Sequence, residues 1–295
     1  MSKATASPKV DRAMRLQDGR VMGYCEWGDL EGRPVVLLHG LLGSRLFCPN
    51  EEATEAAGVR LLTIDRPGYG RSDPRPDRTL LDWADDYLEL AGQLDLPPCP
   101  VVGWSAGGSY ALALGFRAPD LVLTIGLAAS RGPIDQVPGF LDELSTNGRA
   151  AAQLLARDRA AGVAAIEQEC AWFAGDGWQT MFTESWGEAD DRVLAEPETL
   201  EAMKQSFREG ARQGSGGYAA DAIAESTPWD FSVADIRQPA YIWSGESDLV
   251  VGRANADYLA GSIPRATLVT WAGAGHMFPI SHWGKMLAQL DGPSE

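Results

Sequence analysis

The chain has 295 residues, of which 45% are hydrophobic and 22% are charged, a composition typical of a folded globular protein with a large core. Asp and Glu number 41 and Lys and Arg number 25, so the formal net charge is -16. This excess of negative charge repels phosphate backbones and anionic lipids, and we therefore expect neither a nucleic acid nor a membrane as a partner.

The cysteines and the N-terminus indicate where the protein works. Four cysteines, Cys25, Cys48, Cys99 and Cys170, are scattered along the chain without a Cys-x-x-Cys pair, as is usual for free thiols in a reducing compartment. Residues 1–15 are polar and lack the apolar segment of a signal peptide, and no run of about 18 apolar residues is present. We expect a cytoplasmic protein.

The first half of the chain predicts a sheet covered by helices, after a flexible tail at residues 1–12. Strands are expected at 14–17 and 21–27, around the turn dipeptide Asp18-Gly19, and at the wholly apolar segment 34–38. Helices and strands then alternate, with helices at 51–57, 80–94 and 105–118 and strands at 59–64, 100–104 and 121–128. The alternation predicts an α/β fold with a mostly parallel, doubly wound sheet of about eight strands.

The middle of the chain breaks this alternation. Residues 133–227 contain no convincing strand; they hold helical stretches at 149–165 and 198–212 and the aromatic residues Trp172, Phe173, Trp178, Phe182 and Trp186. Alternation then resumes, with strands at 240–243 and 267–271 and helices at 252–260 and 280–290. We therefore predict a core formed by 14–132 and 228–291, with 133–227 as a helical insertion.

The candidate nucleophile is Ser105, in the string Gly103-Trp104-Ser105-Ala106-Gly107. An apolar strand precedes the string and an alanine- and leucine-rich helix follows it. A serine on such a sharp strand-to-helix turn has a strained backbone, and only very small residues fit two positions before and after it. Both of those positions are glycine.

The general base is sought among three histidines. His276 follows the last strand in a glycine-rich loop, at the edge of the sheet where ligands bind in open α/β folds, and we take it as the base. His39 precedes Gly40 at the end of a strand and is expected to hold that turn. His282 lies within the last helical pattern and is expected to be a packing or surface residue.

The acid is expected to come from a loop between the serine and the histidine in chain order, as in proteins with this serine turn. Asp248 lies just past the penultimate strand and is the favoured candidate. Glu246 lies closer to that strand, and Asp135 is the alternative after an earlier strand. Asp65 and Arg66 come before the serine and are expected to form a structural ion pair.

An oxyanion hole requires two backbone N–H groups near the serine. One is expected from Ala106, at the start of a helix whose dipole favours negative charge. The other is expected from Leu41, in the loop that begins at His39-Gly40.

The motifs that carry a family resemblance are His39-Gly40, Asp65-Arg66-Pro67-Gly68-Tyr69-Gly70-Arg71-Ser72, Gly103-Trp104-Ser105-Ala106-Gly107, Gly245-x-x-Asp248 and Gly275-His276. In this order they resemble the α/β-hydrolase fold family, in its serine hydrolase or esterase branch with a helical cap. The resemblance implies that residues 133–227 form the cap that shapes the substrate pocket. Ser105 disfavours the members with an aspartate nucleophile, and Leu41-Leu42 disfavours lipases with a His-Gly-Gly-Gly motif.

The expected activity is hydrolysis of a small, apolar carboxylic ester through an acyl-enzyme, without a metal or organic cofactor. Alternatives on the same residues are carbon–carbon bond hydrolysis, amidase or aminopeptidase activity and a cofactor-free perhydrolase reaction. A small-molecule receptor with residual hydrolysis is the alternative from another class. The pocket is expected to involve Leu42, Trp104, Trp172, Trp178, Trp186 and Met277. The protein is expected to be a monomer or a homodimer.

Overall fold

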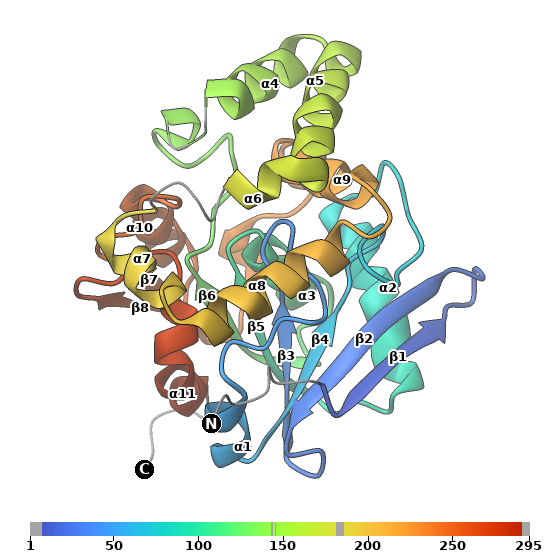
Figure 1. Cartoon of the computed structure of the whole chain (residues 1–295), viewed down its shortest axis with the longest axis vertical. Helices are drawn as coiled ribbons and strands as arrows, with labels where there is room; N and C mark the ends of the chain where they lie inside the picture. Colours follow the sequence, from blue (N-terminus) through green and yellow to red (C-terminus); the bar gives the residue numbers. More distant parts are fainter. Residues whose placement is uncertain (1–7, 143, 145, 181–185, 291–295) are drawn as a thin grey trace.

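The computed structural model describes residues 8–142, 144, 146–180 and 186–290. Eight strands form a single sheet in the order β1-β2-β4-β3-β5-β6-β7-β8 (Figure 1). β2 is antiparallel to both of its neighbours, and every pair from β4 to β8 is parallel. The strands are β1 (Val10–Arg15), β2 (Val21–Gly28), β3 (Arg33–Leu38), β4 (Val59–Ile64), β5 (Cys99–Trp104), β6 (Val122–Ala128), β7 (Ala240–Gly245) and β8 (Ala266–Trp271). The predicted α/β fold with a mostly parallel sheet of about eight strands is confirmed.

Helices cover both faces of this sheet. One face carries α2 (Leu80–Gln93), α3 (Gly107–Arg117) and α10 (Arg253–Ser262), and the other carries α1 (Glu51–Ala56) and α11 (Phe278–Leu290). The β3 strand contributes side chains to both of these faces. Val36 and Leu38 belong to the core on the first face, and Val35 and Leu37 belong to the core on the second. A strand buried on both sides needs a continuous apolar run, as this segment has.

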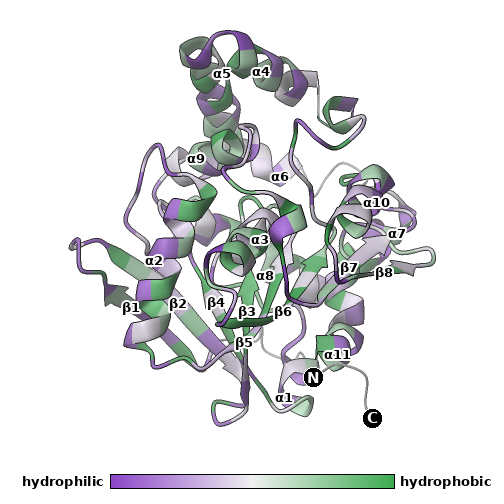
Figure 2. Cartoon of the chain, turned by 180° about the vertical axis from the view of Figure 1, so that it is seen from behind, coloured by the Kyte–Doolittle hydropathy of each residue, from purple (hydrophilic) through white to green (hydrophobic). Residues whose placement is uncertain are grey.

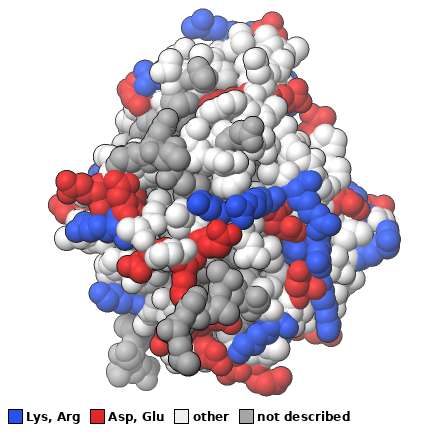
Figure 3. Space-filling model, viewed as in Figure 1, with Lys and Arg blue, Asp and Glu red and all other residues white. Residues whose placement is uncertain are grey.

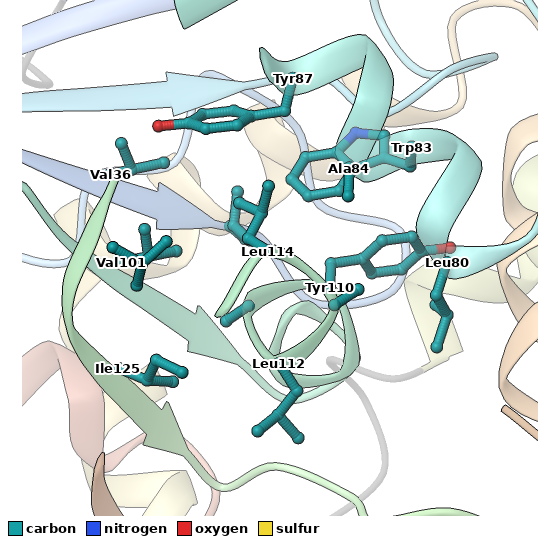
Figure 4. Close-up of a cluster of buried hydrophobic side chains, with 14 of the residues drawn as sticks. Val36, Leu80, Trp83, Ala84, Tyr87, Val101, Tyr110, Leu112, Leu114 and Ile125 are labelled. Atoms are coloured by element: carbon teal, nitrogen blue, oxygen red, sulfur yellow. The ribbon is translucent and has the colours of Figure 1, made fainter. Parts of the chain in front are cut away.

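The first core is built around aromatic residues of α2 and α3 (Figure 4). Trp83 is fully buried and meets the ring of Tyr110 edge-on at 5.2 Å and that of Tyr87 at 5.8 Å. Figure 2 shows how apolar and polar residues are divided between the interior and the surface, with hydrophobic residues on the central strands and polar residues on the outer surfaces of helices such as α2. Acidic and basic side chains are interspersed over the face seen in Figure 3.

A helical segment lies between β6 and β7. It contains η1 (Phe140–Asp142), α4 (Thr146–Arg157), α5 (Arg159–Trp172), η2 (Phe173–Gly177), α6 (Trp178–Thr180), α7 (Glu188–Leu194), α8 (Pro197–Gly210) and α9 (Gly216–Glu225); η3 (Val233–Asp235) follows before β7. We call α4 to α9 the inserted segment. In Figure 1, α4 and α5 lie at its outer end, and α8 passes in front of the central strands.

One expectation about these elements was wrong. β1 begins at Val10, so residues 10–12 are not part of a tail; they pair with β2, Val10 lying opposite Glu26. This polar strand lies at the edge of the sheet, where little apolar pattern is required. The stretch 149–165 is helical as expected and contains parts of two helices. Asp158 separates α4 from α5 and caps α5 by accepting a hydrogen bond from the Ala161 amide at 3.1 Å.

The sheet changes its winding direction at β3. β4 pairs with one side of β3 and β5 with the other, so the loops that follow β3 and β5 leave the sheet side by side. A crevice forms at such a switch point, outside the carboxyl ends of the strands, and open α/β sheets bind their ligands there. The Ser105 turn and the His39-Gly40 loop both lie at this point.

Within the described part of the chain, no helix has both the length and the hydropathy needed to cross a bilayer.

Candidate active site

Ser105 lies at the apex of the turn between β5 and α3, in the left-handed region of backbone conformation, with a φ of 54°. Its amide donates a 2.8 Å hydrogen bond to the Ala128 carbonyl at the end of β6. A Cβ atom at Gly103 would collide with the Gly107 backbone, and one at Gly107 would collide with the Leu38 carbonyl. The two glycines therefore allow the strained turn that the sequence predicts.

The acid and the histidine follow β7 and β8, which lie on the other side of β6 from the Ser105 strand β5. His276 follows β8, and its Nδ1 lies 3.0 Å from Oδ2 of Asp248, which follows β7. Oδ1 of Asp248 accepts hydrogen bonds from the amides of Val250 at 2.8 Å and Val251 at 2.9 Å. With Nδ1 donating to the carboxylate, the Nε2 atom of the ring is left as the proton acceptor.

Asp248 remains ionised in this environment. Burial alone would raise its pKa, but the nearby His276 and the two amide donors outweigh burial and hold the pKa below its usual value of 3.8. An ionised carboxylate at this position can orient the imidazole and stabilise its protonated form.

The loop after β3 lies against the serine. Gly40 is so close that a Cβ atom there would be 3.3 Å from the Ser105 Cβ. Nδ1 of His39 lies 2.7 Å from the carbonyl oxygen of the next residue, Gly40. Burial and the nearby charge of Arg66 hold the pKa of His39 well below 6.5. A neutral, buried His39 fits the structural role expected of it. Leu42 has a φ of 59°, which turns the chain sharply beside Leu41.

Asp65 and Arg66 do not form an ion pair with each other, contrary to expectation. Asp65 accepts from Arg45 Nη1 at 2.8 Å and from the Arg71 amide at 2.9 Å, whereas Arg66 Nε donates to Asp221 at 2.7 Å. The two side chains are consecutive in the chain, but they have different partners, Asp65 pairing with Arg45 and Arg66 with Asp221 on α9.

Asp221, on α9, is the centre of a buried polar cluster. Its Oδ2 accepts from Arg66 and from the Tyr69 hydroxyl at 2.8 Å, and its Oδ1 accepts from the Tyr110 hydroxyl at 2.6 Å and from Arg78. Burial would raise its pKa, but the two guanidinium groups and the hydroxyls together lower it. We call these five residues the Asp221 cluster.

The Asp221 cluster reaches the loop beside the serine. The Arg66 guanidinium also donates to the carbonyl of His39 at 2.5 Å and to that of Gly40 at 3.1 Å. A carboxylate of the inserted segment therefore holds, through one arginine, the backbone from which the second oxyanion donor is expected.

A second carboxylate of the inserted segment contacts the histidine loop. Asp190, on α7, is buried, and its two oxygens accept from the amide of His276 at 2.8 Å and that of Met277 at 2.7 Å. Gly275 permits this approach, because a Cβ atom there would collide with the Asp190 carboxylate. Neither Asp190 nor Asp221 was singled out from the sequence, where both look like ordinary helix acids.

A cavity of about 120 Å³ joins the serine, the histidine and the loop after β3. Its walls are mainly apolar and include Leu41, Leu42, Phe47, Trp104, Phe173, Trp186, Phe207, Tyr218 and Met277. Of the six pocket residues expected from the sequence, Leu42, Trp104, Trp186 and Met277 line it. Phe47 was missed, although it stacks on Trp104 at 4.8 Å, because nothing in its surrounding sequence marks it.

A larger cavity of about 550 Å³ lies next to the first. The two share wall residues from the core and the inserted segment, namely Leu41, Arg131, Phe173, Trp186, Tyr218 and Val250. The larger one extends between α4, α5 and α9, where it is lined by Ile166, Glu169 and Glu225 among others.

Trp172 and Trp178 line neither cavity, which corrects the expectation for both. Trp172 is 54% exposed and lies edge-on against Phe173 at 4.7 Å. Trp178 is buried in the second core, with the Arg208 guanidinium over its ring at 5.6 Å. Each is used in packing the inserted segment. Phe182 lies outside the described residues.

The rejected candidates lie away from this site. His282 packs on Trp271 with ring centroids 4.5 Å apart, Glu246 is exposed and accepts from the Gly273 amide at 3.1 Å, and Asp135 is exposed. None of the three lines either cavity. Among the residues that the structure describes, no three His, Cys, Asp or Glu side chains are grouped so that they could hold a metal ion.

Comparison with known proteins gives relatives along most of the chain. The family model of the alpha/beta hydrolase fold matches residues 33–282. The pimeloyl-[acyl-carrier protein] methyl ester esterase of Aromatoleum aromaticum is 30% identical over 254 residues, 84% of this chain and 92% of that protein. The sn-1-specific diacylglycerol lipase of Mus musculus is 33% identical over 114 residues, which cover 38% of this chain and only 37% of the lipase.

Solved structures share the fold. A hydrolase from Pseudomonas aeruginosa superposes with a TM-score of 0.70 at 21% identity, covering 96% of this chain and 99% of that one. A thermophilic esterase from Thermogutta terrifontis superposes with a TM-score of 0.69 at 22% identity, covering 96% and 97%. The alignments with the first relatives span only about a third of those proteins' length. With the family model matched over residues 33–282, the chain belongs to the alpha/beta hydrolase fold family.

Proposed function

We propose that this enzyme hydrolyses a carboxylic ester through an acyl-enzyme formed on Ser105. The observation that carries the proposal is the His276–Asp248 hydrogen bond beside an apolar cavity that Ser105 and His276 both line. A relative that covers most of the chain is a methyl ester esterase by name, which supports an ester as the bond that is cleaved.

The proposed reaction has two steps. His276 Nε2 takes the Ser105 proton as the oxygen attacks the ester carbonyl, and then gives the proton to the departing alcohol. His276 next activates a water molecule, which releases the carboxylic acid from Ser105. Asp248 keeps the ring in the required tautomer and stabilises the imidazolium; proton transfer of this kind contributes about 10²- to 10⁴-fold to the rate.

The oxyanion would be bound by the backbone amides of Leu41 and Ala106. Leu41 lines the cavity, and Ala106 directly precedes α3, whose helix dipole favours negative charge at that end. One such donor is worth roughly 10²- to 10³-fold in rate. Because Arg66 fixes the carbonyls of His39 and Gly40, the Leu41 amide is presented on a rigid loop.

The shape of the site predicts the substrate class. The cavity beside Ser105 measures about 120 Å³, which is smaller than the roughly 150 Å³ cavity that binds benzene, so it suits a short alkyl chain on one side of the scissile bond. The adjoining cavity of about 550 Å³ leaves room for a larger group on the other side. We propose that helices α4 to α9 act as the cap that encloses this second group.

The test is turnover of p-nitrophenyl acetate, butyrate, octanoate and palmitate by the wild type and by Ser105→Ala. We expect the short esters to be the better substrates and the variant to lose at least 10³-fold in kcat. A wild type that is no faster than Ser105→Ala, and that a fluorophosphonate does not label, would exclude this reaction. Assays with anilides and with acetate plus hydrogen peroxide separate the amidase and perhydrolase alternatives.

A further inference from the structure

We propose that Asp190, contributed by the inserted segment, is a positioning residue that holds the catalytic histidine in place; this rests on the function proposed above. The loop that carries His276 reads Ala272-Gly273-Ala274-Gly275-His276, a flexible sequence. General base catalysis requires the imidazole within hydrogen-bond reach of the nucleophile. Something outside the loop must therefore fix it.

Three hydrogen-bond partners among the described residues hold His276. Asp248 holds the ring through Nδ1 at 3.0 Å, and the Trp104 indole donates to the His276 carbonyl at 3.3 Å. Asp190 holds the remaining backbone group, the amide, at 2.8 Å. Of these hydrogen-bond partners, Asp248 and Trp104 belong to strands or loops of the sheet, and Asp190 comes from the inserted segment. Trp186 of the same segment also lies against the imidazole, with ring centroids 6.1 Å apart, whereas Asp190 holds the backbone of His276.

Asp190 binds the histidine loop through both of its carboxylate oxygens. Its two carboxylate oxygens bind the consecutive amides of His276 and Met277, at 2.8 Å and 2.7 Å, so the backbone is held at two points and its rotation is restricted. Burial raises the pKa of the Asp190 carboxyl above 3.8, and the two amide hydrogen bonds act against this rise because they favour the ionised form. Gly275 has no side chain, and a Cβ atom there would fill the space that Asp190 occupies.

Asp190 is buried, with an exposed fraction of 1%. Among the described residues, the groups that act on its pKa are the amides of His276 and Met277, the His276 ring and Asp248, and no Lys or Arg side chain is among them. A carboxylate buried without a cation is costly. The two amides of the catalytic loop are the groups that offset this cost, and their placement gives the carboxylate a function beyond stabilising α7.

The expected loss of kcat on removing Asp190 follows from how strongly the rate depends on the position of the reacting groups. A shift of about 1 Å in a reacting group costs on the order of 100-fold in rate. Without Asp190, the amides of residues 276 and 277 are left without an acceptor, and the loop can move to reach water. We therefore expect Asp190→Ala to lower kcat by about 10- to 100-fold with KM changed less than about threefold.

The experiment compares Asp190→Ala and Asp190→Asn with the control Glu188→Ala. Glu188 is an exposed acid in the first turn of the same helix, so the control removes the same charge from α7 without touching the histidine loop. Active sites are titrated to completion with a fluorophosphonate, and kcat for p-nitrophenyl butyrate is expressed per titrated site. Asp190→Asn keeps one acceptor oxygen and is expected to fall between Asp190→Ala and the wild type.

The titration separates positioning from stability. A residue that only stabilises the fold would change the fraction of titratable enzyme and the melting temperature, but not kcat per site; that result, or an equal loss in Glu188→Ala, would overturn the proposal. A wild type that neither turns over esters nor reacts with the fluorophosphonate would instead overturn the proposed function, and the positioning role with it.

Discussion

Replacement of Asp221 by asparagine is expected to destabilise the protein strongly, although it changes a single atom. Asp221 is 0% exposed and receives hydrogen bonds from two guanidinium groups and two tyrosine hydroxyls. Asparagine keeps the shape of the side chain, but it carries no charge, and its amide group would face donors. Arg66 and Arg78 would then be buried opposite a neutral side chain.

The size of the effect follows from the burial of these groups. Removing one partner of a buried ion pair costs about 3–5 kcal/mol, because the remaining charge is left uncompensated. Since Arg66 and Arg78 also donate to the carbonyls of His39, Gly40 and Gly217, part of their hydrogen bonding survives. We therefore expect a loss at the lower end, about 3 kcal/mol.

Urea unfolding at pH 7, followed by tryptophan fluorescence, measures this loss. With a slope of roughly 3 kcal/mol per molar urea, the midpoint should fall by about 1 M. Asp230→Asn serves as the control, because Asp230 is an exposed acid a few residues beyond α9. If the free energy of unfolding of Asp221→Asn lies within about 0.5 kcal/mol of the wild-type value, the charge of Asp221 does not stabilise the fold through Arg66 and Arg78.

Three further outcomes are expected. The difference in stability between the wild type and Asp221→Asn should shrink as the pH falls below about 4: the folded pKa of Asp221 lies below 3.8, so its contribution is complete above the unfolded pKa and is lost as the carboxylate is protonated. Urea midpoints at pH 7, 4 and 3 test this. Ser105→Gly should raise the melting temperature by about 2 °C relative to Ser105→Ala, since only glycine relieves a φ of 54°; equal melting temperatures would contradict strain at this turn. Asp248→Asn should lower kcat by about 10⁴-fold while active-site labelling still reaches completion, and a loss below tenfold would show that His276 does not need this carboxylate.

The central strands could be predicted because burial on both faces leaves a continuous apolar run. The segment 59–64 coincides with β4 (Val59–Ile64), and 121–128 differs from β6 by one residue. The start of β1 could not be predicted in this way. Its residues 10–12 are Val10, Asp11 and Arg12, which pair through the backbone at an edge and need no hydrophobic pattern.

The residues of the site also fall into those that local sequence indicates and those that only the packing of distant elements identifies. Ser105 lies in a motif whose glycines are required by local geometry, and the positions of Asp248 and His276 follow from where parallel strands end, so local sequence indicates all three. Asp190 and Asp191 are adjacent acids in α7, yet Asp190 is buried against the histidine loop and Asp191 is exposed. The two residues differ because α7 packs on the core with Asp190 facing inward, and the sequence around them does not predict which face of α7 is buried.

The contacts of Asp221 and Asp190 limit how this enzyme can exchange parts with its relatives. A chimera that receives the whole stretch between β6 and β7 from another hydrolase would lose the acceptor for Arg66 and the acceptor for the amides of His276 and Met277, unless the donor supplies both carboxylates. Helices α4 and α5 pack with α9 in a cluster of their own, so grafting that hairpin alone leaves both contacts intact. Substrate range is therefore best re-engineered by grafting α4 and α5, with α7 and α9 kept as native parts of the core enzyme.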